Sequence, residues 1–218
     1  MKSQKQVSEK IYSTIGRVAS FYDFLSWVVG YKKSVKYFVL HLPFSDDAPI
    51  KVLDAGCGTG VYSLAVLEKY KNAKVTAFDV DKTLVNSFKE KTLNNKMSDR
   101  ICVFTADITG SLLEIGNEKF DLIITAGVLV YVPHEETIRN LSRFLVTGGY
   151  FFNSPNRDSL WGRLVCKLFA CKPYSKAENF SAFEKNGFTL VEDIKVPNTP
   201  AASFKDAHIF SRSNHSRP

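Results

Sequence analysis

One stretch limits the fold of this chain more than any other: VLDAGCGTG, residues 52–60. An apolar run typical of a buried strand leads through an acid into three closely spaced glycines, and a helical pattern follows. Glycines let the backbone turn sharply and approach a ligand without a Cβ clash. The N–H groups at the start of the next helix can bind a polar or anionic group. The stretch therefore predicts a nucleotide-type site at the carboxyl end of a strand.

Short apolar runs alternate with longer amphipathic ones from residue 50 onward. We expect strands at 50–55, 74–80, 101–107, 120–127 and 149–155. We expect helices from the glycine loop to about 71, at 82–95, and from Pro133 to about Val146 with its end at Gly148–Gly149. Later segments predict helices at 157–172 and 175–186, a strand at 188–196 and an antiparallel partner at 203–213. This alternation is typical of a parallel sheet with helices on both faces.

Length and composition favour one globular α/β domain with additions. The chain has 218 residues, of which 44% are hydrophobic and 23% charged. We divide it into an aromatic-rich helical segment at 1–49, a main domain at 50–213 with a helical insertion at 156–187, and a frayed tail at 214–218. No uncharged run approaches the length that spans a bilayer, and no apolar segment follows the charged N-terminus. We expect a cytoplasmic protein.

The net charge and the cysteines restrict the possible binding partners only slightly. The formal net charge of +7 favours an anionic partner: nucleic acid, an acidic membrane surface or an anionic substrate, although solubility alone explains it as well. The four cysteines lack zinc-finger spacing, so we expect reduced thiols and no metal site.

Acids at the ends of three successive predicted strands restrict the class of nucleotide that the site can bind. A dinucleotide fingerprint would place glycine at position 61, where this chain has Val61. Asp54 would repel a pyrophosphate and suit a cationic ligand. Asp79 can accept hydrogen bonds from two ribose hydroxyls, and Asp107 can accept one from an adenine amino group. Each acid alone could equally be a helix cap or a turn residue.

These motifs resemble those of the class I S-adenosylmethionine-dependent methyltransferases over about residues 50–155, in particular the small-molecule enzymes of quinone biosynthesis. VLDAGCGTG is similar to their first motif, AFDVD to their ribose-binding acid, TADIT to their adenine loop and FDLIITAGVLVYVP to their fourth motif. The resemblance implies a Rossmann-like, seven-stranded, mostly parallel sheet of order 3-2-1-4-5-7-6. The last strand would be antiparallel, with helices on both faces.

The resemblance also implies S-adenosylmethionine as cofactor and S-adenosylhomocysteine as product. The cofactor-binding candidates are Asp54, Gly56, Cys57, Gly58, Gly60, Asp79, Val80, Asp107, Ile108, Ala126 and Gly127. The catalytic candidates are Tyr131, His134 and Tyr22. Tyr131 stands where many small-molecule members have a histidine. The alternatives to catalysis are packing against the substrate for Tyr131, a polar position in the first turn of a helix for His134 and a place in the aromatic core for Tyr22.

The acceptor is predicted from what the fourth motif lacks. It has no N-P-P-[FY] or D-P-P-Y element, which is typical of enzymes that methylate nitrogens in nucleic acids and proteins, so we expect a small, apolar or amphipathic acceptor. The alternatives are an RNA methyltransferase, which the lack of a basic stripe disfavours, and a cofactor-binding partner without activity of its own. The amphipathic segments Arg17–Leu42 and Leu160–Lys172 could cover the acceptor or contact a membrane surface.

Overall fold

The computed structural model describes residues 31–95, 97–160, 163, 166–167, 171, 174–195 and 205–212. The strands are β1 Lys51–Ala55, β2 Lys74–Asp79, β3 Ile101–Thr105, β4 Phe120–Ala126, β5 Leu145–Ser154, β6 Phe188–Asp193 and β7 His208–Arg212. The helices are α3 Tyr31–Leu40, α4 Val61–Lys69, α5 Lys82–Asn94, α6 His134–Ser142 and α8 Lys176–Lys185. Three short 3-10 turns complete them: η1 Ser98–Arg100, η2 Leu113–Ile115 and η3 Leu129–Tyr131.

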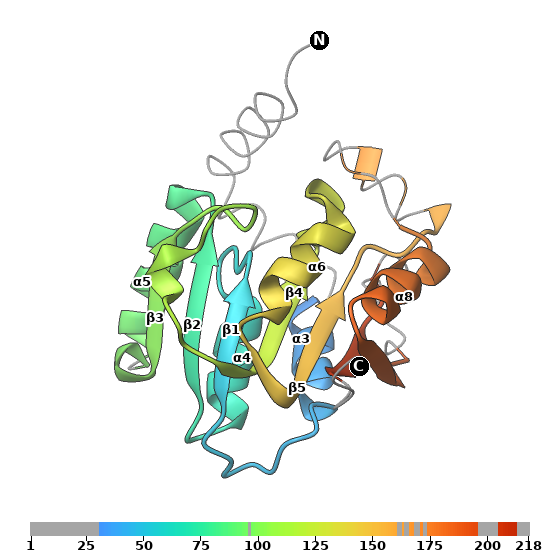
Figure 1. The fold of residues 1–218 in the computed structure, drawn as a ribbon. Coiled ribbons are helices and arrows are strands. Elements are labelled where there is room, and N and C mark those ends of the chain that lie inside the picture. The colour runs from blue at the N-terminus through green and yellow to red at the C-terminus, as the bar shows by residue number, and fades with distance from the viewer. Residues whose placement is uncertain are drawn as a thin grey trace.

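The strands form one seven-stranded sheet of order β3-β2-β1-β4-β5-β7-β6 (Figure 1). The pairs from β3 to β5 are parallel, whereas β7 runs antiparallel to both of its neighbours, β5 and β6. The predicted fold class and strand order are confirmed. The parallel strands all end at the same edge of the sheet, and the residues that follow them meet there.

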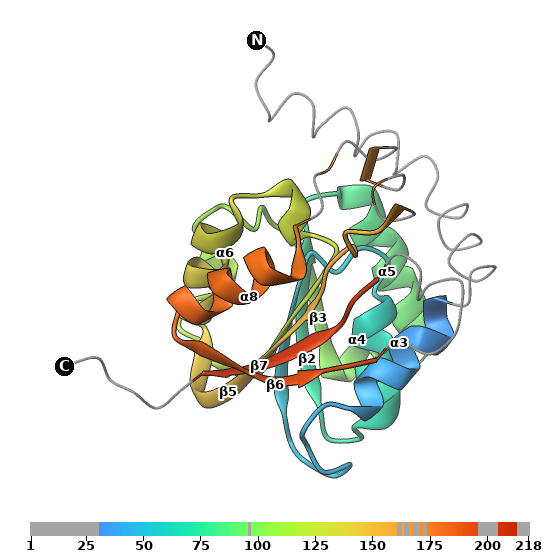
Figure 2. The ribbon, with the colours of Figure 1, turned by 90° about the vertical axis from the view of Figure 1, so that its right-hand side faces the viewer.

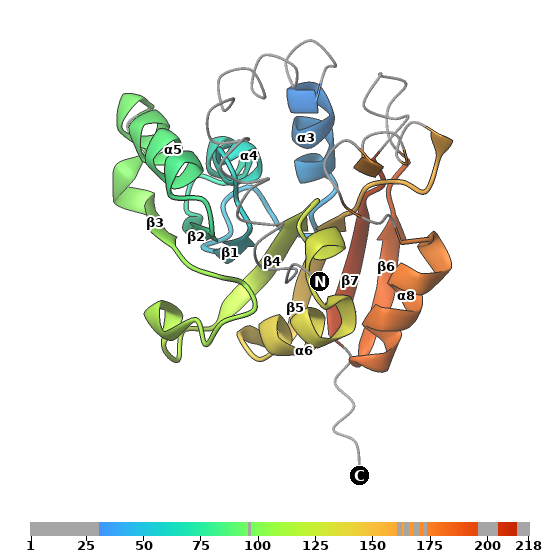
Figure 3. The same ribbon diagram turned by 90° about the horizontal axis from the view of Figure 1, so that it is seen from above.

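Helices cover both faces of the sheet, as Figures 2 and 3 show: α3, α4 and α5 on one face, α6 and α8 on the other. The period of two along β1 explains the division. Val52 packs in the core under α3 and α4, while Leu53 and Ala55 pack in the core under α6 and α8. Asp54 points to the same face as Val52, toward α4.

Side-chain caps explain where two helices begin. Asp81 accepts hydrogen bonds from the N–H groups of Thr83 and Leu84, at 2.7 and 3.2 Å, and so caps α5. Ser175 and Glu178 form a reciprocal capping box at the start of α8. Gly60 is the N-cap residue of α4 and provides no side-chain cap. The first N–H groups of this helix are therefore not occupied by a capping side chain.

The prediction of a helix that runs to Val146 and ends at Gly148–Gly149 is wrong. Helix α6 ends at Ser142 and β5 begins at Leu145. The register shifts between Phe120 and Leu122, so several β5 residues lie opposite one residue of β4. Gly148 has φ +75°, and a Cβ at Gly149 would lie 3.0 Å from the Val146 carbonyl oxygen. The two glycines therefore lie in an irregular part of the strand pairing, where Gly148 has the positive φ that a helix end also favours.

Several predicted features lie outside the described residues. These are most of the N-terminal segment, half of the residues of the 157–172 helix and the tail after residue 212. The proposed division into segments stays a prediction. Within the described part of the chain, no helix is long and apolar enough to cross a membrane, and no cluster of three or more His, Cys, Asp or Glu could hold a metal ion.

The core under α8 generates a stability prediction. Phe183 is fully buried, stacks on Phe210 with ring centroids 3.9 Å apart, and contacts Phe151 edge-on. Phe183→Ala should lower the free energy of unfolding by about 3–5 kcal/mol, because the rings of Phe151, Phe188 and Phe210 cannot close the cavity that the substitution leaves. The exposed Leu93→Ala should change it by less than about 0.5 kcal/mol. Urea denaturation measures both, and equal costs would contradict this packing.

Candidate functional site

The glycine loop between β1 and α4 is held by its own backbone. Gly56, Gly58 and Gly60 have φ of +79°, +53° and +81°. The N–H groups of Gly56 and Cys57 both donate to the Phe78 carbonyl oxygen at 2.9 Å, and the Gly60 N–H donates to the Cys57 carbonyl oxygen at 2.9 Å. The left-handed conformations explain why glycine stands at all three positions.

The three glycines face different surroundings. A Cβ at Gly56 would lie 2.7 Å from the Val128 side chain, and one at Gly60 would lie 2.0 Å from the Phe88 ring. Around Gly58, no heavy atom of the described residues lies within 4 Å of that position. Gly56 and Gly60 therefore allow close protein packing, whereas Gly58 presents bare backbone to open space.

Asp79 joins the loop to the end of β2. It is 8% exposed, and one carboxylate oxygen accepts the Gly58 N–H at 2.8 Å while the other accepts the Asp81 N–H at 3.0 Å. Burial raises the pKa of the carboxyl, and these backbone hydrogen bonds oppose the rise. Each oxygen has a second lone pair, so Asp79 can still accept further hydrogen bonds.

Asp54 lies beneath the loop. It is 1% exposed, and the Ser63 hydroxyl on α4 donates to it at 2.6 Å. The pKa of its carboxyl is raised to about 7. Burial is the main cause of the rise, the hydrogen bond from Ser63 opposes it, and the negative charge of Asp79 adds to it. No cation pairs with it among the described residues. The thiol of Cys57 is also buried, and burial raises its pKa.

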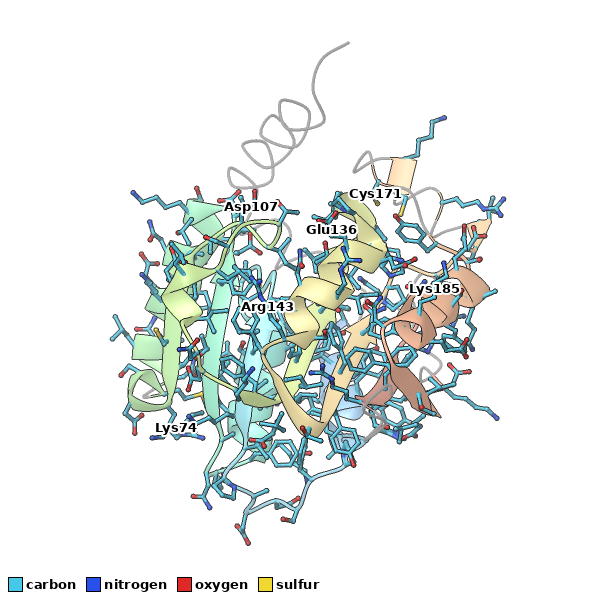
Figure 4. The ribbon with its side chains drawn as sticks, in the orientation of Figure 1. Lys74, Asp107, Glu136, Arg143, Cys171 and Lys185 are labelled. Atoms are coloured by element: carbon cyan, nitrogen blue, oxygen red, sulfur yellow. The ribbon has the colours of Figure 1, made fainter. Side chains whose placement is uncertain are left out.

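The ends of β2 and β3 present one exposed apolar and one exposed acidic side chain. Val80 is 46% exposed directly after Asp79, and Asp107 is exposed. The N–H and hydroxyl of Thr109 donate to Asp107 at 2.9 and 2.7 Å. Ile108 is buried in the core under α6. In Figure 4, Asp107 lies at the upper edge of the molecule, opposite Lys74 at the amino end of β2.

The end of β4 reaches the same edge. Ala126 is its last residue, and Gly127 follows with φ +74°. The Gly127 N–H donates to the Ser154 carbonyl oxygen at the end of β5, at 3.0 Å. Both predicted residues are partly exposed, so the structure brings them to the edge that carries Gly58 and Asp79.

The structure places the catalytic candidates Tyr131 and His134 in different surroundings. Tyr131 ends η3, and its side chain is hydrogen-bonded to the Cys171 thiol. His134 is buried at the start of α6, stacks on Tyr174 with centroids 4.4 Å apart, and has its pKa lowered by burial. Its ring therefore lies beside the segment that leads into α8. Tyr22 lies outside the described residues.

Sequence reasoning missed three residues of this edge. Ser63 follows the glycine loop by three positions and has no signal beyond its place on α4. Asn156 and Lys205 lie after β5 and before β7, and only the folded chain brings them together, through an isolated bridge between their backbones. A lysine in the run SFKDAHIF reads as an ordinary exposed residue, yet Lys205 is 7% exposed.

The site thus combines bare backbone at Gly58, two buried acids that pair with no cation of the described residues, and an exposed apolar side chain at Val80. Such an edge can hold a ligand that brings hydroxyls to Asp79, a flat apolar group to Val80 and positive charge near Asp54. The residues fit S-adenosylmethionine in each of these respects.

Comparison with known proteins identifies the domain. Residues 52–149 match a family model described as a methyltransferase domain. A malonyl-[acyl-carrier protein] O-methyltransferase from Paenibacillus sp. (strain JDR-2) is 30% identical over 100 residues, which cover 45% of this chain and 36% of that protein. This chain therefore matches well under half the length of that relative.

Solved structures share the fold. A Haloferax volcanii methyltransferase in complex with the activator Trm112 has a TM-score of 0.75 at 15% identity, covering 91% of this chain and 97% of that one. Geranyl diphosphate C-methyltransferase from Streptomyces coelicolor A3(2) has a TM-score of 0.67 at 15% identity, covering 82% and 78%. Residues 52–149 thus match a methyltransferase domain, and the sheet has the strand order that the resemblance to the class I S-adenosylmethionine-dependent methyltransferases implies.

Proposed function

We propose that this chain binds S-adenosylmethionine at the carboxyl edge of β1, β2 and β4 and transfers its methyl group to a small, apolar or amphipathic acceptor. The observation that carries the proposal is the open face of Gly58, whose N–H is fixed by Asp79. Bare backbone beside a buried carboxylate is what a nucleoside needs in order to approach a strand end closely.

The nucleoside would lie over the ends of β2 and β3. Asp79 would accept hydrogen bonds from the ribose hydroxyls with its remaining lone pairs. Val80 would pack on the adenine ring, and Asp107 would accept a hydrogen bond from the adenine amino group. Ile108, buried beneath the same loop, would support this position from the core.

The methionine end would follow the loop toward β4. Gly56, Cys57 and Gly60 hold the loop in the shape that Gly58 presents, and Ala126 and Gly127 bound the site on the far side. Asp54 would stabilise the positive charge of the ligand from beneath. Its raised pKa reflects the cost of holding a buried carboxylate without a cation, and a cationic ligand offsets that cost.

Methyl transfer from a sulfonium places modest demands on side chains. The methyl carbon is already activated, so most of the rate comes from holding the acceptor atom in line with it. A general base matters only for an acceptor that must lose a proton. We assign Tyr131 and, in the N-terminal segment, Tyr22 to the acceptor side. His134, stacked on Tyr174, would support the segment beside that side.

A partner-dependent activity is the second candidate. It is favoured by the likeness to a methyltransferase solved together with an activator protein, a likeness that covers nearly the whole of both chains. In this case the chain would bind the cofactor alone and methylate only with its partner.

Two substitutions test the cofactor site. Asp79→Ala should weaken binding of S-adenosylmethionine by about 10- to 150-fold, since a hydrogen bond to a charged acceptor contributes about 1.5–3 kcal/mol. Gly58→Ala should also weaken it, because the new methyl group occupies the open face. Calorimetry measures both affinities.

Gly116→Ala is the matched control for Gly58→Ala. Gly116 has φ +59°, near the +53° of Gly58, an equally open Cβ position and a place shortly before the amino end of β4. Both variants should lose similar stability in a thermal melt, and only Gly58→Ala should lose affinity. Equal affinity in both variants would remove the loop from the site.

Asp54 gives a pH-dependent prediction. Its folded pKa of about 7 lies above the ordinary value, so ionisation destabilises the folded state as pH rises from about 4 to about 7. Asp54→Asn should therefore melt at a higher temperature than the wild type at pH 8 and show little advantage at pH 4. A melt series that shows no pH-dependent difference would contradict the buried, unpaired carboxyl.

The same group links ligand binding to protons. A cationic ligand lowers the pKa of Asp54, so binding of S-adenosylmethionine near pH 6.5 should release protons. Calorimetry in buffers of different ionisation enthalpy counts them, and Asp54→Asn should release fewer. An unchanged proton count in the variant would show that the ligand's charge lies elsewhere.

The acceptor class can be found with methyl-labelled S-adenosylmethionine and fractionated cell extract. We expect label in the lipid or small-molecule fraction. Label in RNA alone would overturn the small-molecule assignment. Cofactor binding by the purified chain, with methylation only after extract protein is added, would favour the partner-dependent activity.

A further inference from the structure

A buried lysine reaches the end of β4 from two strands away. Lys205 precedes β7, which lies beyond β5 from β4 in the sheet. Its Nζ lies 2.9 Å from the position that a Cβ at Gly127 would take, although the residue is only 7% exposed. The missing side chain at Gly127 leaves room for this ammonium group.

The backbone around Lys205 is fixed to the end of β5 by several contacts. Lys205 forms a bridge with Asn156, and the Asp206 N–H donates to the Pro155 carbonyl oxygen at 3.2 Å. The Ser154 hydroxyl donates to the Asp206 carbonyl oxygen at 2.9 Å. The Asp206 carboxylate is paired with Arg157 at 2.8 Å. The backbone that carries the lysine is therefore fixed to the end of β5.

No carboxylate pairs with Lys205 among the described residues. Its one adjacent acid, Asp206, is engaged with Arg157. Its other neighbours are the Tyr31 ring, with the centroid 5.9 Å from Nζ, and the thiols of Cys166 and Cys171. Figure 4 shows Cys171 at the same upper edge as Asp107.

Isolated buried charges are costly, and proteins normally pair them. Burial lowers the pKa of Lys205 to about 8, so the amine still holds its proton over most of the neutral range. A positive charge kept at the site edge without a carboxylate partner among the described residues indicates that the partner arrives with a ligand.

We propose that Lys205 is the cationic group of an anion-binding subsite at the carboxyl end of β4, which takes a carboxylate or a similar anionic oxygen from the ligand. The inference rests on the proposed function, because it places the subsite beside the methyl donor. Two sources share this chemistry: the amino-acid carboxylate of S-adenosylmethionine, and an anionic oxygen on the acceptor. The proposed subsite binds the anion, and no covalent bond is made or broken there.

The test compares Lys205→Met with the wild type and with Lys167→Met. Methionine keeps the length of the lysine side chain and removes its charge, so the variant should melt at or above the wild-type temperature. Lys167 is an exposed lysine of the same region. Its substitution removes the same formal charge from an exposed side chain. Lys205→Gln is the second variant in case methionine packs differently.

Two ligands test whether the carboxylate of the cofactor is the anion that Lys205 binds. S-adenosylhomocysteine carries the carboxylate, whereas 5′-methylthioadenosine shares the nucleoside and thioether and lacks the amino acid. If the cofactor supplies the anion, Lys205→Met should bind S-adenosylhomocysteine about 10- to 150-fold more weakly and 5′-methylthioadenosine unchanged, as expected for a charged hydrogen bond. Lys167→Met should bind both as the wild type does.

The second source is tested on the complex with S-adenosylhomocysteine. If the acceptor supplies the anion, acetate or inorganic phosphate at constant ionic strength should raise the melting temperature of this complex in the wild type and in Lys167→Met, and not in Lys205→Met. Folded variants with neither an affinity change nor a lost anion response would overturn the subsite. A wild type that binds neither nucleoside, yet shows a Lys205-dependent rise in melting temperature with the anion in the free protein, would contradict the proposed function while supporting the subsite.

Discussion

The hydrogen bond from the Gly58 N–H to the Asp79 carboxylate organises the carboxyl edge of the sheet. The same carboxylate accepts the N–H of Asp81, and Asp81 in turn caps α5. One buried acid therefore joins the glycine loop, the end of β2 and the start of a helix. The open face of Gly58 depends on this arrangement, because the loop must stay in its left-handed conformations to present bare backbone.

Charge is unevenly distributed along this edge. Asp54 and Asp79 lie buried at β1 and β2 without a cation among the described residues, and Lys205 lies buried next to the end of β4 without a carboxylate. Each group alone is unfavourable in the free protein. Together they suit a ligand that is positive in one part and negative in another, and an amino-acid sulfonium joined to a nucleoside has that character.

The sequence predicts those features that are local in the chain. Hydrophobic alternation predicted the strands, and the three glycines with Asp54, Asp79 and Asp107 predicted the loop and the strand-end acids, because each lies within a few residues of the element that positions it. Gly148–Gly149 is ambiguous in the sequence because a positive φ suits a helix end and an irregular strand equally well, and only the pairing of Leu145 with Phe120 decides between them. Lys205 was missed because its importance comes from Gly127, 78 positions earlier, through a contact that exists only after β7 inserts beside β5.

The central claim is that the edge at Gly58 and Asp79 binds S-adenosylmethionine rather than another nucleotide. The most direct test is calorimetric titration of the unmodified protein with S-adenosylmethionine and, separately, with a nicotinamide dinucleotide. We predict one S-adenosylmethionine per chain and no binding of the dinucleotide, because Asp54 and the glycine spacing disfavour a pyrophosphate. Binding of the dinucleotide with no response to S-adenosylmethionine would contradict it.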